Sequence, residues 1–129
     1  MLIEILPRIW IADKKHQSSE VQNIVYIEKE LNRKVYSIHN FIERQHEYAR
    51  YLKEMVKFLY YYSVLKMKSI VLVDKGIHER QDAYMILIAY MKYYGKITWK
   101  DGYQHVKKKT IPFQLSSFSS GVLDLFHVS

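Results

Sequence analysis

The sequence contains no cysteine, only two prolines and four glycines, and no apolar run of membrane-spanning length. The absence of cysteine excludes disulfide scaffolds, zinc or iron–sulfur sites with cysteine ligands, and every thiol nucleophile. It leaves the redox compartment undecided, because only the presence of cysteines would identify one. The longest apolar stretch, residues 84–91, is far shorter than the roughly 20 residues that a bilayer requires. We therefore expect no membrane partner.

The start of the chain also lacks the pattern of a secretory signal. Glu4 and Pro7 lie where a signal peptide would have a basic segment followed by a long apolar one. An intracellular protein, cytoplasmic by default, is the expectation.

What the chain does contain is enough apolar material for one globular core. Its 129 residues are 49% hydrophobic and 26% charged, which excludes disordered and collagen-like classes. No repeat, low-complexity tract or linker divides it, so we expect a single domain over residues 1–129. There are 20 Lys and Arg against 13 Asp and Glu, a formal net charge of +7. Such a chain attracts acidic partners, for example nucleic acid, a phosphorylated ligand or an anionic surface.

The apolar pattern predicts an α/β protein with strands early in the chain and helices later. Residues 3–12 predict two short strands around Pro7, because proline cannot occupy a central ladder position. Residues 24–27 and 35–38 predict two further strands. Residues 69–73 form an apolar run that predicts a central parallel strand, buried on both faces.

Two long helices are expected around that central strand. Residues 41–67 contain neither Gly nor Pro, and their apolar side chains recur at the spacing of one helix face: Tyr48, Leu52, Met55, Leu59 and Tyr62. Residues 81–94 are apolar nearly all round, which is typical of a helix packed inside the fold. Gly95 follows in the position of a C-terminal cap.

Two shorter helices complete the predicted fold. Thr98 is placed to cap a helix over residues 99–109, and Ser116 or Ser117 to cap a last helix that ends near Phe126. Thr and Ser suit these positions because their hydroxyl oxygens accept hydrogen bonds from the free N–H groups of the first turn.

The strand at residues 70–73, the loop at 74–80 and the helix at 81–94 form the unit most typical of a functional site. A buried strand that leads into a helix N-terminus directs backbone N–H groups and the positive end of the helix dipole to one point. This arrangement is a general way to hold an anion.

The same unit carries a resemblance to a known family. Residues 70–83 read I-V-L-V-D-K-G-I-H-E-R-Q-D-A, and residues 88–91 read I-A-Y-M. This resembles the dual-specificity protein phosphatase family, which shows V-L-V-H-C-x5-R-S-A followed by an A-Y-L-M helix. Residues 5–11 are similar to the family's opening strand pair, so the resemblance covers essentially the whole chain. It implies a three-layer fold, in which a short, mostly parallel central sheet is flanked by helices.

The catalytic loop of the family is degenerate here. In the family a cysteine thiolate attacks phosphorus and an arginine clamps the phosphoryl oxygens. A direct match of the strand puts Lys75 at the cysteine position and Gln81 at the arginine position; keeping the x5 spacing instead puts Asp74 and Arg80 there. The whole degenerate loop is Asp74, Lys75, Gly76, Ile77, His78, Glu79, Arg80 and Gln81. In both registers the nucleophile is missing.

The family's general acid is missing as well. Asn40 takes the position of the aspartic acid that protonates the leaving group, with Glu43 as the alternative. Loss of a covalent nucleophile alone costs several orders of magnitude in rate. The resemblance therefore implies a protein that is not an enzyme.

The loop retains basic side chains that could contact an anion, namely Lys75, His78 and Arg80. Asp74 and Glu79 lie in the same loop and Asp82 directly follows it, and Asp74 would compete with a phosphate dianion for the same N–H groups. We therefore disfavour phosphopeptide binding and favour a loop that is kept for fold stability.

No metal or cofactor is expected. His78 and Glu79 begin like a zinc-protease motif, but Asp82 stands where the second histidine should be. The other histidines lack ligand spacing. A Ser/His/Asp triad has no G-x-S-x-G motif to support it.

Two surface features could serve a partner. The basic run at residues 107–109 could bind nucleic acid, but a solvated helix end, where cations suit the dipole, is favoured. The tyrosine runs at residues 60–62 and 93–94 are too many rings for one helix face, so some must be exposed. Exposed tyrosines suit an interaction surface, including a homodimer, as well as they suit ordinary surface exposure.

The sequence therefore predicts a pseudophosphatase that acts by protein binding, as a scaffold, or as a structural component. One alternative is a phosphatase or other hydrolase with residual activity from relocated residues. Another is a basic protein that associates with nucleic acid or is packaged in a particle.

Overall fold

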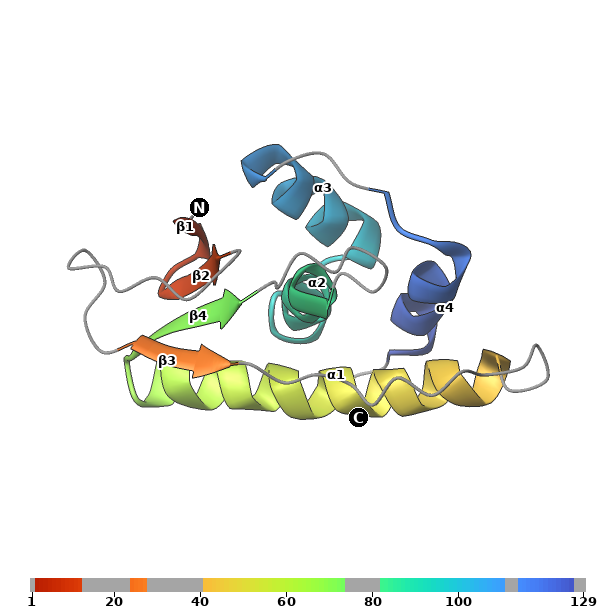
Figure 1. The fold of residues 1–129 in the computed structure, drawn as a ribbon, viewed down its shortest axis with the longest axis horizontal. Helices are drawn as coiled ribbons and strands as arrows, with labels where there is room; N and C mark the ends of the chain where they lie inside the picture. The colour runs from red at the N-terminus through yellow and green to blue at the C-terminus, as the bar shows by residue number, and fades with distance from the viewer. Residues whose placement is uncertain (1, 13–23, 28–40, 74–81, 111–113, 127–129) are drawn as a thin grey trace.

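The computed structural model describes residues 2–12, 24–27, 41–73, 82–110 and 114–126 of the chain (Figure 1). Its elements, in chain order, are β1 (Leu2–Leu6), β2 (Ile9–Ala12), β3 (Ile24–Ile27), α1 (Phe41–Tyr60), the π-helix η2 (Tyr61–Leu65), β4 (Ser69–Val73), α2 (Asp82–Tyr94), α3 (Trp99–Lys109) and α4 (Ser117–Leu125). The predicted strand at residues 35–38 lies outside the described residues.

The strands form one mixed sheet in the order β1-β2-β4-β3. β1 and β2 are antiparallel, while β2 and β3 both pair with β4 in parallel. Ala12 pairs with Val73 and Ile27 pairs with Leu72, so the carboxyl ends of three parallel strands meet at one edge, called the carboxyl edge below. The strands predicted in residues 3–12, at 24–27 and at 69–73 are confirmed.

The central strand is buried on both faces, as its unbroken apolar run predicts. Ile70 and Leu72 point to one face and Val71 to the other, and none is more than 1% exposed. Parallel strands covered on both sides have no solvent face that would require alternating polar residues.

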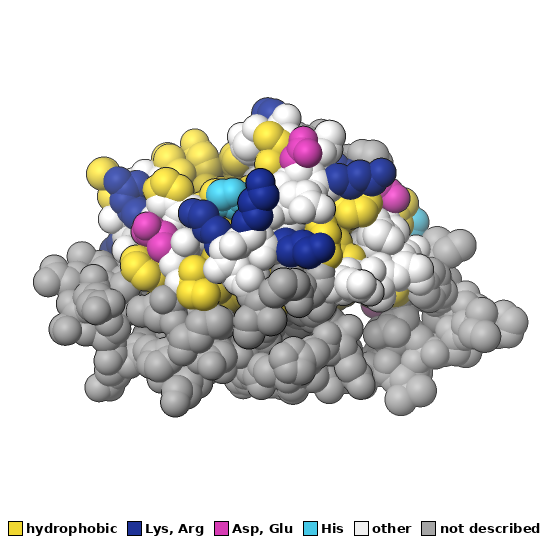
Figure 2. All heavy atoms as spheres, turned by 90° about the horizontal axis from the view of Figure 1, so that it is seen from above, with side chains coloured by type: hydrophobic (Ala, Val, Ile, Leu, Met, Phe, Trp, Pro, Cys, Tyr) yellow, Lys and Arg dark blue, Asp and Glu magenta, His cyan; other side chains and the backbone are white. Residues whose placement is uncertain are grey.

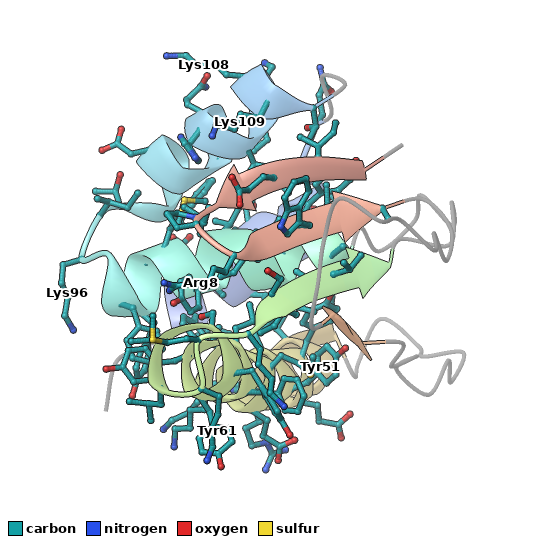
Figure 3. The ribbon with its side chains drawn as sticks, turned by 90° about the vertical axis from the view of Figure 1, so that its left-hand side faces the viewer. Arg8, Tyr51, Tyr61, Lys96, Lys108 and Lys109 are labelled. Carbon is teal, nitrogen blue, oxygen red and sulfur yellow. The ribbon has the colours of Figure 1, made fainter. Side chains whose placement is uncertain are left out.

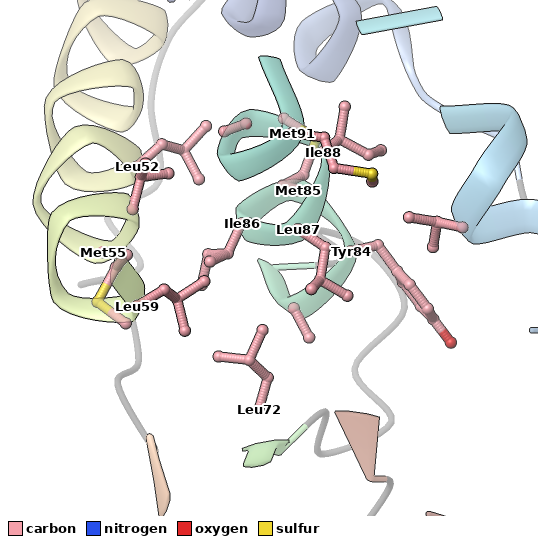
Figure 4. Packing of buried hydrophobic residues seen from close by; sticks show 14 of the residues in the cluster. Leu52, Met55, Leu59, Leu72, Tyr84, Met85, Ile86, Leu87, Ile88 and Met91 are labelled. Carbon is pink, nitrogen blue, oxygen red and sulfur yellow. The ribbon is translucent and has the colours of Figure 1, made fainter. Parts of the chain in front are cut away.

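The described helices lie on one side of the sheet, with α2 behind its centre and α1 and α3 beside its two edges (Figures 1 and 3). Leu52 and Leu59 of α1 extend toward α2, and Leu72 of β4 closes the core from the sheet (Figure 4). Residues 83–89 of α2 are all buried, which confirms that this helix lies inside the fold. Burial of each large aliphatic side chain stabilises the fold by roughly 1.5–3 kcal/mol.

The end of α1 departs from the predicted helix over residues 41–67. Regular α-helix stops at Tyr60, and η2 then brings the Lys66 N–H to the Tyr61 carbonyl at 2.9 Å. Within this stretch the Ser63 hydroxyl donates to the Leu59 carbonyl at 2.6 Å, and the Arg8 guanidinium donates to the Ser63 carbonyl at 3.2 Å. Both bonds compete with the ordinary helical ladder, which accounts for the change of helix type.

The turn after α2 is also different in detail. The helix ends at Tyr94 as predicted, but the left-handed residue is Lys96, with φ 55°, and not Gly95. Gly95 is required for close approach instead, because a Cβ there would lie 2.6 Å from the carbonyl oxygen of Met91.

The predicted caps of the last two helices are confirmed. The Thr98 hydroxyl accepts from the Asp101 N–H at 3.2 Å, and the Ser116 hydroxyl accepts from the Ser119 N–H at 3.1 Å. Ser116, and not Ser117, is therefore the cap of α4.

The described residues thus define an α/β protein with a small mixed sheet and four α-helices. They form a sheet layer and a helix layer, and the three-layer arrangement stays a prediction. In these ranges of the chain, no helix combines the length and apolar character that a membrane span requires.

Candidate functional site

The candidate site is the connection between β4 and α2. β4 ends at Val73 and α2 begins at Asp82, so the degenerate loop connects the carboxyl end of the central strand to the start of the buried helix. The loop residues named above, from Asp74 to Gln81, lie outside the described residues, and so does Asn40. Glu43 lies in α1. The register of the loop and its anion contacts therefore stay predictions.

The frame around this connection is well defined by packing. Leu72 near the end of β4 and Met85 in the first turns of α2 are both within 1% of complete burial. In open α/β sheets, ligands bind outside the carboxyl ends of the strands, where connections to helices begin. The carboxyl edge of this sheet is therefore where a ligand site of this fold class is expected.

The far end of α2 is tied to α4. Lys92 Nζ donates to the Leu123 carbonyl at 2.6 Å, and Asp124 next to it accepts from Trp99 Nε1 at 2.8 Å. Burial lowers the pKa of Lys92, and the nearby Asp124 carboxylate partly offsets that effect by raising it. These contacts hold α2 in place from the end opposite the candidate site.

Basic side chains near the end of α3 form hydrogen bonds to β1. His105 Nε2 lies 3.0 Å from the Ile5 carbonyl oxygen, and Lys109 Nζ donates to the same oxygen at 3.3 Å. Lys107 lies over the Tyr103 ring, 5.6 Å from its centre. Figure 2 shows Lys and Arg side chains gathered over this upper face of the molecule. Part of the basic run therefore joins α3 to β1. The positive lysines also suit the carboxyl-terminal end of α3, which is the negative end of the helix dipole.

The two tyrosine runs, which are far apart in the sequence, meet in space. The Tyr60 ring at the end of α1 stacks on the Tyr94 ring at the end of α2, with centroids 4.2 Å apart and planes at 10°. Tyr93 and Tyr90 contact the Tyr94 ring at 4.7 and 5.3 Å. Burial raises the pKa of Tyr94, and the neighbouring tyrosines raise it further. The sequence does not predict this contact, because the two runs lie in separate helices and local spacing does not show which helices pack together.

Among residues 2–12, 24–27, 41–73, 82–110 and 114–126, no group of three or more His, Asp or Glu side chains could hold a metal ion. The chain matches no family model and no curated protein sequence. The geometry of the sheet and the residues of the chain therefore carry the functional argument.

Proposed function

We propose that this protein is a catalytically inactive relative of the dual-specificity phosphatases, which acts by binding other proteins. The observation that supports it most is the combination of a central parallel strand leading into a buried helix with a chain that contains no cysteine. The strand order β1-β2-β4-β3, with β4 between two parallel neighbours, is compatible with the proposed three-layer fold.

The chemistry of the loop explains why catalysis is lost. Phosphoryl transfer by this route needs a nucleophile that is ionised near neutral pH and that can form and release a bond to phosphorus. A carboxylate such as Asp74 and an amine such as Lys75 are not the thiolate that this mechanism requires. Asn40 cannot supply a proton to the leaving group as a carboxylic acid does. The loop thus has neither the nucleophile nor the acid.

Without catalytic residues in the loop, the proposed role of the domain is that of a scaffold that binds other proteins. In our proposal the Asp74 carboxylate accepts hydrogen bonds from the loop N–H groups that would otherwise hold a phosphate. The negative charge of Asp74 at the base of the loop would also repel a dianion. Recognition of a protein partner would then rest on the outer surface of the domain.

A phosphatase assay at high protein concentration tests this proposal. The unmodified protein should not hydrolyse a fluorogenic aryl phosphate, and Asp74→Cys and Lys75→Cys should each be assayed in parallel to sample both registers. Turnover by the unmodified protein that disappears in Arg80→Ala/Gln81→Ala would overturn the proposal and favour the residual-hydrolase alternative. This double variant is the control for a contaminating phosphatase, whose activity would depend on neither residue.

A further inference from the structure

The large exposed hydrophobic residues of the described chain lie in two short segments that follow adjoining helix ends. Five large apolar side chains are more than a third exposed, and they lie in two short segments: Tyr61 (44%), Val64 (45%), Leu65 (61%) and Met67 (67%) after α1, and Ile97 (38%) after α2. Single exposed apolar residues are common on any protein, but a cluster of them marks an interaction site. We call these five residues and the cations around them the basic apolar patch.

Ring contacts and hydrogen bonds join the segments of the patch. The Tyr60–Tyr94 stack connects the end of α1 to the end of α2, just before each exposed segment begins. The bond from Arg8 to the Ser63 carbonyl connects η2 to the turn between β1 and β2. In Figure 3, Arg8 and Lys96 lie at the amino-terminal ends of β2 and β4, and Tyr61 lies below them. The patch therefore lies on the side of the sheet opposite the carboxyl edge.

The shape of the patch is held by local structure and is not a frayed helix end. η2 is a π-helix, and such segments often occur at functional sites. Met67 and Lys96 have left-handed backbone angles, with φ 53° and 55°, although neither is glycine. Such conformations are unfavourable, and they persist only where the surrounding structure holds them.

The charge around the patch is positive. Lys57, Lys66, Lys68 and Lys96 are exposed beside the apolar residues, and Arg8 is partly exposed. Neither residues 57–68 nor residues 83–100 contain an Asp or Glu. Glu4 lies beside the rim, and its Oε2 accepts from the Arg8 N–H at 3.3 Å. The patch therefore offers apolar side chains within a rim of cations.

We propose that the basic apolar patch binds an acidic segment of a partner protein, one that carries apolar side chains between its carboxylates. Carboxylates would pair with the lysine rim, and the apolar side chains would cover Leu65 and Met67. A second copy of this chain would set lysines against lysines. A lipid surface is tested separately by the vesicle measurement described below. The proposal rests on the protein acting by binding, as argued above.

A peptide titration tests this proposal with the full chain. The probe is a short fluorescein-labelled peptide in which Glu and Leu alternate, and a matched peptide in which Glu and Ser alternate tests the apolar contribution. The Glu-Leu peptide should bind more tightly than the Glu-Ser peptide. The double variants Leu65→Ser/Met67→Ser and Lys66→Glu/Lys68→Glu should each weaken its binding by about tenfold or more. Failure of the unmodified protein to bind the Glu-Leu peptide would overturn the proposal.

A matched charge variant separates the patch from the overall charge of +7. Lys107→Glu/Lys108→Glu makes the same change in net charge in the last turn of α3, away from Tyr61 and Lys96 (Figure 3). It should leave peptide affinity within about twofold, since a surface charge far from the site acts only through a screened field. An equal loss of affinity in this variant would show that net charge alone drives binding, and would overturn the proposal.

Two further measurements exclude the other occupants. Binding to phosphatidylserine/phosphatidylcholine vesicles that is lost in Leu65→Ser/Met67→Ser would assign the patch to a lipid surface. A dimer in sedimentation equilibrium that dissociates in the same variant would assign it to a second copy. Either result overturns the proposal of an acidic protein segment. Turnover in the aryl phosphate assay would instead remove the proposed function and leave these binding results unchanged.

Discussion

The two opposite edges of the sheet differ in the kind of charge that they carry. The loop that follows β4 at the carboxyl edge contains Asp74 and Glu79 among its basic residues. The basic apolar patch at the other edge has cations beside exposed apolar side chains, with no acidic residue in either of its two helix-end segments. In open α/β sheets ligands bind outside the carboxyl ends of the strands, and a phosphate site there would need positive charge. The reversal favours binding at the outer surface over catalysis at the loop.

Both edges depend on one helix. α2 begins next to the degenerate loop and ends at the stacked tyrosines, and its centre is packed against β4 and α1. A change in the middle of α2 therefore affects the two edges together, whereas a change at one end should affect them separately.

The largest effect is expected for Leu87→Ala, which removes a fully buried side chain from the centre of α2. The cavity and the lost burial should lower the free energy of unfolding by about 2–5 kcal/mol. Urea denaturation measures this loss. Leu65→Ala in the patch is the matched control, because that side chain is 61% exposed and its loss should change stability by about 0.5 kcal/mol or less. Equal losses in the two variants would contradict the packing described for α2.

A smaller loss of stability is expected for Gly121→Ala in α4. A Cβ at this position would collide with the Gln45 amide, which donates to the Phe118 carbonyl at 3.1 Å. Because that amide is the end of a flexible side chain, the forced shift mainly removes its hydrogen bond, and the free energy of unfolding should fall by about 0.5–1.5 kcal/mol. Peptide binding at the patch should be unchanged under folding conditions, because Gly121 belongs to neither edge.

The double variant Gly121→Ala/Gln45→Ala controls for the cause of that loss. Removal of the Gln45 amide takes away the collision, so part of the stability should return relative to the sum of the two single changes. Strict additivity of the two losses would mean that the clash is not the source of the effect.

The smallest expected effect concerns the pH dependence of stability at the tyrosine cluster. The pKa of Tyr94 is raised above its ordinary value near 10, mainly by burial and then by the neighbouring tyrosines. The unfolded chain therefore loses the Tyr94 proton first as pH rises. The stability that this group contributes is complete below pH 10 and is lost as pH rises through the folded-state pKa.

Tyr94→Phe tests this sign. Thermal unfolding monitored between pH 9 and 11 should show a shallower decrease of stability in the variant than in the unmodified protein, since one ionising group is gone. An unchanged slope would mean that the stacked tyrosines do not resist ionisation in the folded protein. The loop at the carboxyl edge should play no part in this result.

Local patterns predicted the elements whose causes are local. The apolar run at residues 69–73 and the all-round apolar helix after it require burial wherever they are placed, and both are buried. Thr98 and Ser116 cap their helices through bonds to residues three positions on, so the sequence alone contains both partners. The strand at residues 35–38 and the loop register stay predictions.

Features that depend on distant partners could not be predicted in this way. η2 replaces the end of the predicted helix partly because Arg8, which is 55 positions away in the sequence, donates to the Ser63 carbonyl. The Tyr60–Tyr94 stack joins two runs that sequence periodicity treats separately.

The sequence by itself determined that thiolate chemistry is impossible in this chain, because that conclusion requires only the absence of cysteine. It also determined the central strand and the helix that follows it, since an unbroken apolar segment must be buried away from water. Only the tertiary structure decided where the exposed apolar residues gather and that cations surround them. Such a patch is formed by side chains from separate segments, and the contacts that bring those segments together are not encoded at any one position.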